Sequence, residues 1–237
     1  MKKVIVISLG GSLIIPEKID IKFLKKFKKV IQKNTERYKF IIVCGGGGVA
    51  RKYISALKKL KISEKLQSLS GISATRMNAR FMNYFFNNNP EQGIPHTINL
   101  LEKYIKEKDV VFCGALEYKP HQTSDATAVE IARHFKTIFI NLTNVKGLYD
   151  KNPFEHKDAK FIPRISLKDF YKIANKTKYS PGQHSVLDQT ASKIILKHKI
   201  PTYILGKNLK NLNNLLHGRK FTGTIIKENG KHINSLQ

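Results

Sequence analysis

Cysteine is scarce in this sequence, and long apolar runs are missing from it. Its 237 residues include only two cysteines, Cys44 and Cys113, each at the end of an apolar run without metal-ligand neighbours. Two such thiols exclude a disulfide framework and indicate buried side chains in a reducing, cytoplasmic compartment. No apolar stretch approaches the roughly 20 residues that a membrane helix requires, so we expect no membrane span.

Acidic residues are also few, with 17 Asp and Glu against 43 Lys and Arg, which leaves a formal charge of +26. This excess indicates either a surface for nucleic acid or another polyanion, or a lysine-rich composition on solvated helix faces. We favour composition and expect no nucleic-acid partner, because the lysines are dispersed and no aromatic-interleaved RNA-binding pattern accompanies them. The positive field would still attract anionic nucleotides.

Apolar runs typical of buried strands alternate with helical segments along the chain. The strand candidates cover residues 4–9, 40–44, 110–113, 137–140 and 201–205. Most are followed by loops rich in Gly, Ser, Thr or Asn. The alternation predicts an α/β fold with a parallel sheet, and ligands of such sheets gather beyond the carboxyl ends of the strands.

Several helix signals accompany these strands. Asp20 is expected to cap a helix with an apolar face of Ile21, Leu24, Phe27 and Ile31. A longer helix is expected over 63–86, and its polar stretch 75–79 faces either a cleft or solvent. Ser166 and Asp169 form a capping-box pattern.

Two glycine loops are candidate phosphate sites. Gly10-Gly11-Ser12 follows the first strand, and four glycines at 45–48 lie between a strand and a helix. Bare amides at a helix start form an anion site, and Arg51, one turn into that helix, is close enough to reach a phosphate. Neither loop has the GxGxxG spacing of a dinucleotide fold or the GK[ST] ending of a P-loop.

Together with other short phrases, these loops resemble the amino acid kinase family, and within it the archaeal uridylate kinases. The phrases occur in family order and spacing from about residue 3 to 226. They are Leu9-Gly10-Gly11-Ser12, Gly45-Gly46-Gly47 with Ala50-Arg51-Lys52-Tyr53, Gly71-Ile72 with Ala74-Thr75-Arg76-Met77-Asn78-Ala79, Thr123-Ser124-Asp125-Ala126, Thr143-Asn144-Val145 with Gly147-Leu148-Tyr149, Ser185-Val186-Leu187-Asp188 with Lys193-Ile194-Ile195, and Gly223-Thr224-Ile225-Ile226.

The resemblance implies a three-layer α/β/α sandwich with an open, mainly parallel central sheet. It implies one domain over 1–226, with an acceptor lobe at about 1–135 and a nucleotide lobe at about 136–226, followed by a polar tail at 227–237. The implied reaction transfers the γ-phosphoryl group of MgATP to UMP in de novo pyrimidine biosynthesis. The relatives assemble as hexamers of dimers, and the same is expected here. Because the eight histidines show no paired metal-ligand spacing, Mg²⁺ is expected to arrive bound to ATP.

The same resemblance implies a role for each matching residue. The catalytic set is Asp188, Gly10 and Gly11. The ATP-binding set is Ser8, Gly10, Gly11, Ser12, Gly47, Arg51, Thr143, Asn144, Gly147, Tyr149 and Asn152. The UMP-binding set is Gly46, Ser68, Arg76, His121, Gln122, Thr123, Ser124 and Asp125.

Some positions have a second interpretation. Asp188 and Asp125 are each placed to cap a helix, and His121 is either a phosphate contact or a solvent-facing loop residue. Ser68 stands where the family has an acidic residue for the UMP ribose, and the loop at 115–122 is about three residues longer than usual. These two departures raise a second hypothesis, a kinase for another small phosphate or carboxylate. Ser180 and Asn152, in place of a Lys and an Asp, raise a third, a non-catalytic nucleotide-binding relative.

Overall fold

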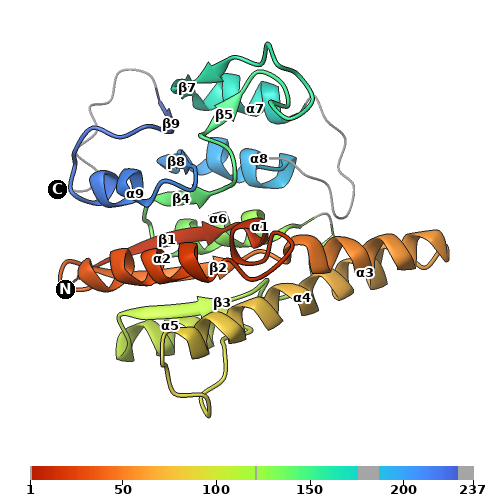
Figure 1. The fold of residues 1–237 in the computed structure, drawn as a ribbon, viewed down its shortest axis with the longest axis vertical. Coiled ribbons are helices and arrows are strands. Elements are labelled where there is room, and N and C mark those ends of the chain that lie inside the picture. Colours follow the sequence, from red (N-terminus) through yellow and green to blue (C-terminus); the bar gives the residue numbers. More distant parts are fainter. Residues whose placement is uncertain (1, 121, 176–186, 229–237) are drawn as a thin grey trace.

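A seven-stranded sheet forms the centre of the protein (Figure 1). The computed structural model describes residues 2–120, 122–175 and 187–228. The strands follow the order β3-β2-β1-β4-β8-β9-β7, and only the β8–β9 pair is antiparallel. Their bounds are Lys3–Leu9 for β1, Tyr38–Cys44 for β2, Val110–Cys113 for β3, Phe139–Leu142 for β4, Arg164–Ser166 for β7, Thr202–Leu205 for β8 and Thr224–Lys227 for β9. A separate two-stranded hairpin pairs β5 (Leu148–Tyr149) with β6 (Phe161–Ile162).

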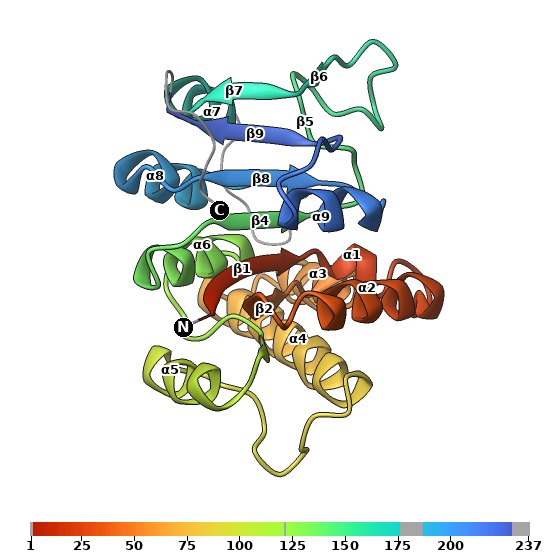
Figure 2. The same cartoon turned by 90° about the vertical axis from the view of Figure 1, so that its left-hand side faces the viewer.

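Helices cover both faces of this sheet (Figure 2). The bounds are Gly11–Ile14 for α1, Ile21–Lys33 for α2, Gly47–Lys59 for α3, Glu64–Phe85 for α4, Ile98–Glu107 for α5, Ser124–His134 for α6, Leu167–Ala174 for α7, Gln189–His198 for α8 and Leu209–Leu216 for α9. One core cluster joins the sheet to α2, α4 and α9, and the other joins it to α5, α6, α7 and α8. The α/β/α sandwich with a mainly parallel sheet is therefore confirmed.

The central strands are apolar throughout because each of their faces is buried. In β1, Ile5 and Ile7 belong to the first cluster, whereas Val6 belongs to the second. The same alternation places Cys44 in the first cluster and Cys113 in the second, so the two buried thiols lie on opposite faces of the sheet. Side chains of successive strand residues point to opposite faces, which accounts for the continuous apolar runs in the sequence.

The predicted α2 is correct except for its first apolar residue. Asp20 caps the helix by accepting a hydrogen bond from the Phe23 N–H group at 3.0 Å. Phe23, Leu24, Phe27 and Ile31 form the buried stripe, whereas Ile21 is 55% exposed. At 3.6 residues per turn, Ile21 lies about 100° around the helix from the centre of that stripe. Including Ile21 in the buried face was therefore wrong.

Two boundaries also moved. The strand predicted at 137–140 is β4, Phe139–Leu142, so Asn141 lies within the sheet rather than in the loop that follows. There it is paired in register with Ser8 and Ile204 on the neighbouring strands, and this pairing decides where the strand ends. Lys227, expected to begin the polar tail, is the last residue of β9, opposite Ser166.

Hydrogen bonds bring the carboxyl ends of four strands together. The Gly45 N–H group donates to the Leu9 carbonyl at 2.9 Å, and the Gly10 N–H group donates to the Leu142 carbonyl at 3.0 Å. Thr143 donates in the same way to Leu205 at 2.9 Å. The loops that follow β1, β2, β4 and β8 therefore lie side by side at one edge of the sheet.

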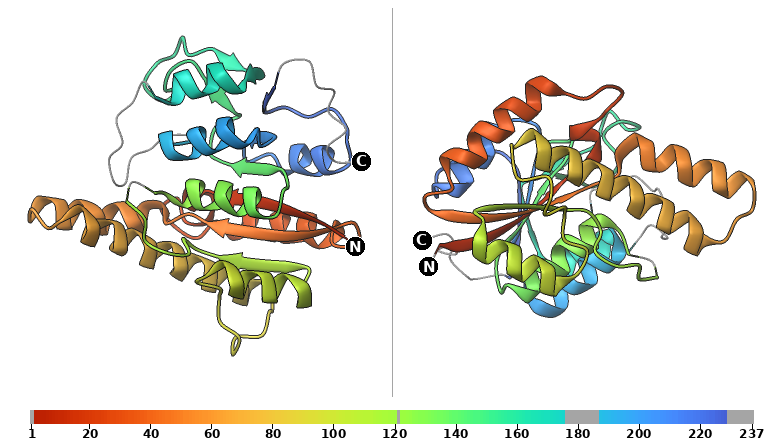
Figure 3. Two further views of the ribbon diagram at one scale, coloured as in Figure 1. Left: turned by 180° about the vertical axis from the view of Figure 1, so that it is seen from behind. Right: turned by 90° about the horizontal axis from the view of Figure 1, so that it is seen from below.

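Helices α3 and α4 form a hairpin that projects beyond the sheet (Figures 1 and 3). Ile54 of α3 packs with Ala74 of α4 in a small core cluster of its own. Within residues 2–120, 122–175 and 187–228, no helix combines the length and apolarity required to cross a membrane.

Candidate active site

The two glycine loops touch each other at the carboxyl edge of the sheet. A Cβ atom added to Gly11 would lie 2.1 Å from the Gly47 nitrogen and 2.7 Å from the Gly45 carbonyl oxygen. Gly47 itself has a φ of +62°, a conformation that favours glycine. This contact is possible only because neither residue carries a side chain, and it leaves their backbone groups bare.

Helix α3 begins directly at this contact. Gly46 is its N-cap residue, and no side chain caps the helix there. The first N–H groups of an α-helix have no partner within the helix, and its dipole makes that end attractive to anions. The second glycine loop therefore has the features of a phosphate site.

Two polar side chains frame this loop. A guanidinium nitrogen of Arg51 lies 3.9 Å from the position of a Cβ atom on Gly48, and the described residues offer Arg51 no carboxylate within ion-pair distance. The buried Asn78 donates its side-chain amide to the Gly45 carbonyl at 2.7 Å. Arg51 was a predicted site residue, whereas Asn78 was not. The signal for Asn78 was its place in the stretch 75–79, in which two polar side chains, Thr75 and Asn78, are buried.

Beside the loops, the N-termini of α6 and α8 meet through a hydroxyl group. Thr123 donates its hydroxyl hydrogen bond to the Asp188 Oδ2 atom, and its oxygen accepts from the Ala126 N–H group at 3.2 Å. The other carboxylate oxygen of Asp188 accepts from the Ala191 N–H group at 2.8 Å. Asp188 thus caps α8 and also holds the residue that caps α6.

Asp125 has a different partner from the one its sequence position indicated. Thr123, and not Asp125, is the N-cap of α6, so the capping interpretation of Asp125 was wrong. The Asp125 carboxylate instead accepts a hydrogen bond of 2.6 Å from the hydroxyl group of Ser8, a fully buried residue of β1. Helix α6 packs against β1 with this side turned toward the strand, and that placement decides the contact.

Both carboxyl groups are held in surroundings that favour their protonated forms. Burial raises the pKa of Asp125 to about 7, helped by the nearby Asp188 and opposed by the Ser8 hydrogen bond. Burial also raises the pKa of Asp188, against hydrogen bonds from Thr123 and from the backbone of α8. The described part of the chain contains no ion-pair partner for either group.

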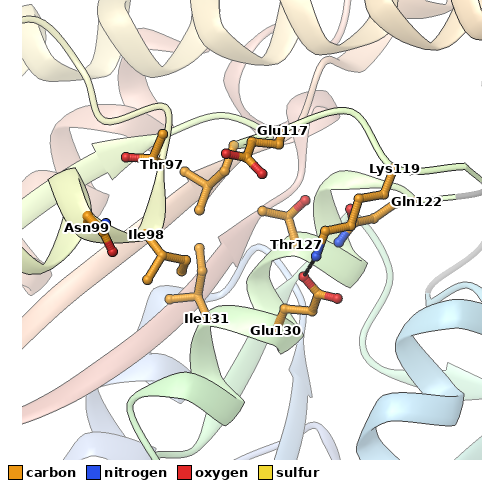
Figure 4. A pocket seen from close by; sticks show the side chains of 10 residues that line it. Thr97, Ile98, Asn99, Glu117, Lys119, Gln122, Thr127, Glu130 and Ile131 are labelled. Carbon is orange, nitrogen blue, oxygen red and sulfur yellow. Dashed lines mark hydrogen bonds and ion pairs between the residues drawn. The ribbon is translucent and has the colours of Figure 1, made fainter.

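The loop from β3 to α6 forms one wall of a pocket of about 290 Å³, together with α5 and α6 (Figure 4). Helix α5 contributes its first turn and α6 contributes Thr127, Glu130 and Ile131. The Lys119 ammonium group bridges the pocket to Glu130 at 2.6 Å. Gln122, a predicted UMP contact, lines this pocket, and His121 lies outside the described residues.

A second cavity, of about 230 Å³, lies beyond the carboxyl ends of β4 and β8. Asn144, Lys146 and Lys207 are among its lining residues. Of these, only Asn144 was predicted. Lys146 and Lys207 follow the ends of two parallel strands, and this position was the signal that could have identified them.

The sequence model of the amino acid kinase family matches residues 3–206 of this chain. The chain belongs to the amino acid kinase family. A uridylate kinase from Thermoplasma volcanium is 35% identical over 231 residues, which cover 96% of this chain and 99% of that protein. One from Thermococcus kodakarensis is 33% identical, covering 94% and 98%. The crystal structure of uridylate kinase from Archaeoglobus fulgidus superimposes with a TM-score of 0.79 at 32% identity, covering 95% of this chain and all of that one.

Not every predicted residue of this amino acid kinase lies against the glycine loops. The ring of Tyr149 packs against Phe161 within the β5–β6 hairpin, tilted by 58° with 5.7 Å between the ring centres. Asn152 bonds within its own turn, accepting from the Phe154 N–H group at 3.1 Å. Gly147 packs against Thr224 of β9, whose hydroxyl oxygen would lie 2.5 Å from an added Cβ atom. The contacts of these three residues are with the hairpin and β9, not with the glycine loops.

Three other predicted residues belong to segments that meet at the glycine loops. Ser12 is in α1, directly after Gly11. Ser68 is on α4, three residues before Gly71, whose carbonyl oxygen would lie 3.5 Å from a Cβ atom on Gly46. Thr143 approaches Gly10 from the end of β4, with its Cα atom 3.9 Å from the position of a Cβ on that glycine.

Proposed function

We propose that this amino acid kinase is a UMP kinase, which transfers the γ-phosphoryl group of ATP to UMP and forms UDP for pyrimidine nucleotide biosynthesis. The observation that carries the proposal is the contact between Gly11 and Gly47, which sets two bare backbone loops against each other at one helix N-terminus. Two such loops suit a phosphoryl group in transit between a donor and an acceptor phosphate. The full-length similarity to uridylate kinases supports UMP as the acceptor.

Phosphoryl transfer requires little covalent chemistry from the protein. It depends on aligning the donor and acceptor phosphates and on neutralising the negative charge spread over the phosphate oxygens. In this proposal Gly10 and Gly11 hold the phosphoryl group in transit, while Gly46 faces the acceptor phosphate. Gly47 and Arg51 lie nearer the donor phosphates, where the Arg51 cation is not neutralised by a carboxylate among the described residues.

The donor nucleotide would occupy the carboxyl edge of β1 and β4 and the loops beyond it. Ser8 and Ser12 flank its phosphates, and the base and ribose are assigned to Thr143, Asn144, Gly147, Tyr149 and Asn152. The cavity beside Asn144 supports this assignment, since it opens where β4 and β8 end. Lys146 and Lys207, which line it, add positive charge on the donor side.

The acceptor would bind at the N-terminus of α6, where Thr123, Ser124 and Asp125 present the first turn of an eleven-residue helix. Ser68, Arg76, Gln122 and His121 complete the assigned acceptor set. Asp188 organises the centre by fixing the Thr123 hydroxyl group while capping α8. One carboxylate therefore fixes the N-termini of α6 and α8 relative to each other.

Magnesium is proposed to enter with ATP. The described residues contain no group of three or more His, Cys, Asp or Glu side chains that could hold a metal ion by themselves. Asp125 and Asp188 lack ion-pair partners in the same ranges, and oxygen ligands of this kind fit Mg²⁺ when nucleotide phosphates supply the rest. Bound in this way, Mg²⁺ would neutralise charge on the transferring phosphates.

A coupled assay of ADP release tests the proposal. The purified protein is given MgATP with UMP, CMP, dUMP, AMP or isopentenyl phosphate, each in a separate reaction. Turnover with UMP alone is expected. Turnover with another acceptor only would move the function to that substrate, the hypothesis that Ser68 and the long 115–122 loop raise. If no acceptor gives ADP release although ATP still binds, the protein would be a non-catalytic relative.

Asp188→Asn tests the centre itself. The amide keeps the size of the side chain and can still accept from the Ala191 N–H group, but it removes the carboxylate that accepts from Thr123. We expect turnover to fall below about 1% while the Kd for ATP stays within a few-fold. Unchanged turnover would remove Asp188 from the centre and leave it as a helix cap.

We further propose that the protein is cytoplasmic and forms a homo-oligomer, a hexamer, as the family resemblance implies. Each chain would consist of an acceptor lobe at 1–135 and a nucleotide lobe at 136–226. Four apolar side chains on one stripe of α4 support self-association, because each is at least one-third exposed: Leu66, Leu69, Met77 and Tyr84. Size-exclusion chromatography with light scattering measures the mass. A monomer at micromolar concentration would refute the assembly.

A further inference from the structure

The loop between β3 and α6, called the acceptor loop below, crosses helix α4 at Gly114 with no space between them. A Cβ atom on Gly114 would lie 2.6 Å from the Thr75 hydroxyl oxygen and 2.7 Å from the Arg76 backbone nitrogen. Gly114 is the first residue after β3, so the loop that leads to α6 starts in direct contact with the middle of α4. The path of the loop is therefore set at this crossing.

Two adjacent residues of α4 bind the backbone of the loop just beyond this crossing. The Ala115 N–H group donates to the Thr75 hydroxyl oxygen at 3.0 Å. Arg76 donates from Nε to the Ala115 carbonyl at 3.2 Å and from a terminal nitrogen to the Leu116 carbonyl. A guanidinium group presents its donors as a rigid planar fork, which suits two successive carbonyl oxygens.

No carboxylate of the described residues lies within ion-pair distance of Arg76. Among these residues, the hydrogen bonds of the Arg76 side chain are with the Ala115 and Leu116 carbonyls of the loop. The loop is held again at Lys119, the third residue after Leu116, by an ion pair with Glu130 on α6, and it ends at Thr123, the cap of that helix. Side-chain contacts thus attach the described part of this loop to α4 and to α6.

We infer that Arg76 is a positioning residue, which holds the acceptor loop through the Ala115 and Leu116 carbonyls and so fixes where the acceptor nucleotide binds. The inference rests on the proposed function, and it changes the role of Arg76 within the acceptor set from ligand contact to loop support. A direct ligand would act only when the acceptor is present. A positioning residue orders the loop in the free protein as well.

The experiment therefore begins without substrate. Hydrogen exchange of a peptide spanning 114–120 is compared among the parent protein, Arg76→Ala, Arg76→Lys and Arg80→Ala. Arg80 is the matched control, since it is an exposed arginine one turn further along α4. We expect exchange to become about tenfold faster in Arg76→Ala, because two hydrogen bonds to the loop are lost, and to stay unchanged in Arg80→Ala.

Arg76→Lys separates hydrogen-bond geometry from charge. Lysine keeps the positive charge but cannot reproduce the fork, so exchange should remain faster than in the parent protein. In both Arg76 variants the KM for UMP should rise about tenfold or more, while the KM for ATP stays within a factor of two. If Arg76→Ala fails to fold, Arg76→Lys alone decides the question.

Unchanged loop exchange in the free Arg76 variants would overturn the inference, whatever happens to the KM for UMP. A higher KM with unchanged exchange would identify a direct acceptor contact instead. If the parent protein phosphorylates no acceptor, the proposed function fails, but the exchange measurement still shows whether Arg76 orders the loop. The two failures are therefore distinguishable.

Discussion

Replacing Asp125 by Asn should stabilise the protein at alkaline pH. The Asp125 carboxyl group accepts a hydrogen bond from the buried Ser8 hydroxyl group, and burial with the nearby Asp188 raises its pKa to about 7. An Asn oxygen can accept the same hydrogen bond from Ser8. The substitution removes a charge that the folded protein holds at a cost, without removing the contact.

The size and sign of the effect follow from linkage. Below pH 3.8, the ordinary pKa of the group, folded and unfolded chains are both protonated, so ionisation of Asp125 contributes nothing. As the pH rises toward about 7, the unfolded chain loses the proton first, and the folded state is progressively destabilised. At about 1.4 kcal/mol per pH unit, the cost above pH 7 reaches at most about 4 kcal/mol, which Asp125→Asn would remove.

Thermal unfolding of the parent and the Asp125→Asn variant from pH 4.5 to 8.5 measures this cost. The difference in Tm should be small at pH 4.5 and should grow to roughly 8–16 °C in favour of the variant at pH 8.5, at about 2–4 °C per kcal/mol. The control is Asp169→Asn, because hydrogen bonds from Ser166 and Lys172 lower the pKa of that exposed carboxyl group. Its effect should therefore have the opposite sign, with the variant less stable at high pH. A Tm difference for Asp125→Asn that does not increase with pH would refute the reasoning.

Four further substitutions test the glycine loops. Gly11→Ala places a Cβ atom 2.1 Å from the Gly47 nitrogen, so we expect it to lower the free energy of unfolding by about 3 kcal/mol and to abolish most ATP binding. The control is Gly48→Ala, which should be neutral because its nearest contact is at 3.5 Å. Equal Tm and equal Kd for ATP in the two variants would contradict the contact. Arg51→Ala should weaken ATP binding about tenfold at low salt and less at high salt, and titration calorimetry at two ionic strengths checks this. Asn78→Ala leaves the Gly45 carbonyl without its buried donor and should lower stability by about 1–3 kcal/mol in urea unfolding; an unchanged urea midpoint would show that this hydrogen bond is not needed.

The strands and the two glycine loops could be predicted from the sequence because their signals are local. A strand buried on both faces is apolar throughout, and a loop that must approach another backbone closely requires glycine. Gly11 and Gly47 are recognisable in this way although they are 36 positions apart in the chain. The order of these motifs also carried the family resemblance, and with it the α/β/α fold.

Contacts between residues distant in sequence were decided only by the tertiary structure. Ser8 and Asp125 are 117 positions apart, and they meet because α6 packs against β1 with Asp125 turned toward the strand. That same orientation leaves the cap of α6 to Thr123, which then reaches Asp188 on α8. A sequence shows that a polar residue begins a helix, but its partner depends on how the helix is rotated against the sheet.

The hydrogen bonds between Arg76 and the acceptor loop also depend on tertiary packing. The sequence places Arg76 in a polar stretch of a helix, and the resemblance assigned it to UMP. Only the crossing of α4 with Gly114 puts its guanidinium group against the Ala115 and Leu116 carbonyls. Local sequence therefore determined which elements form and which loops can bind phosphate, while packing determined which side chains hold those loops in place.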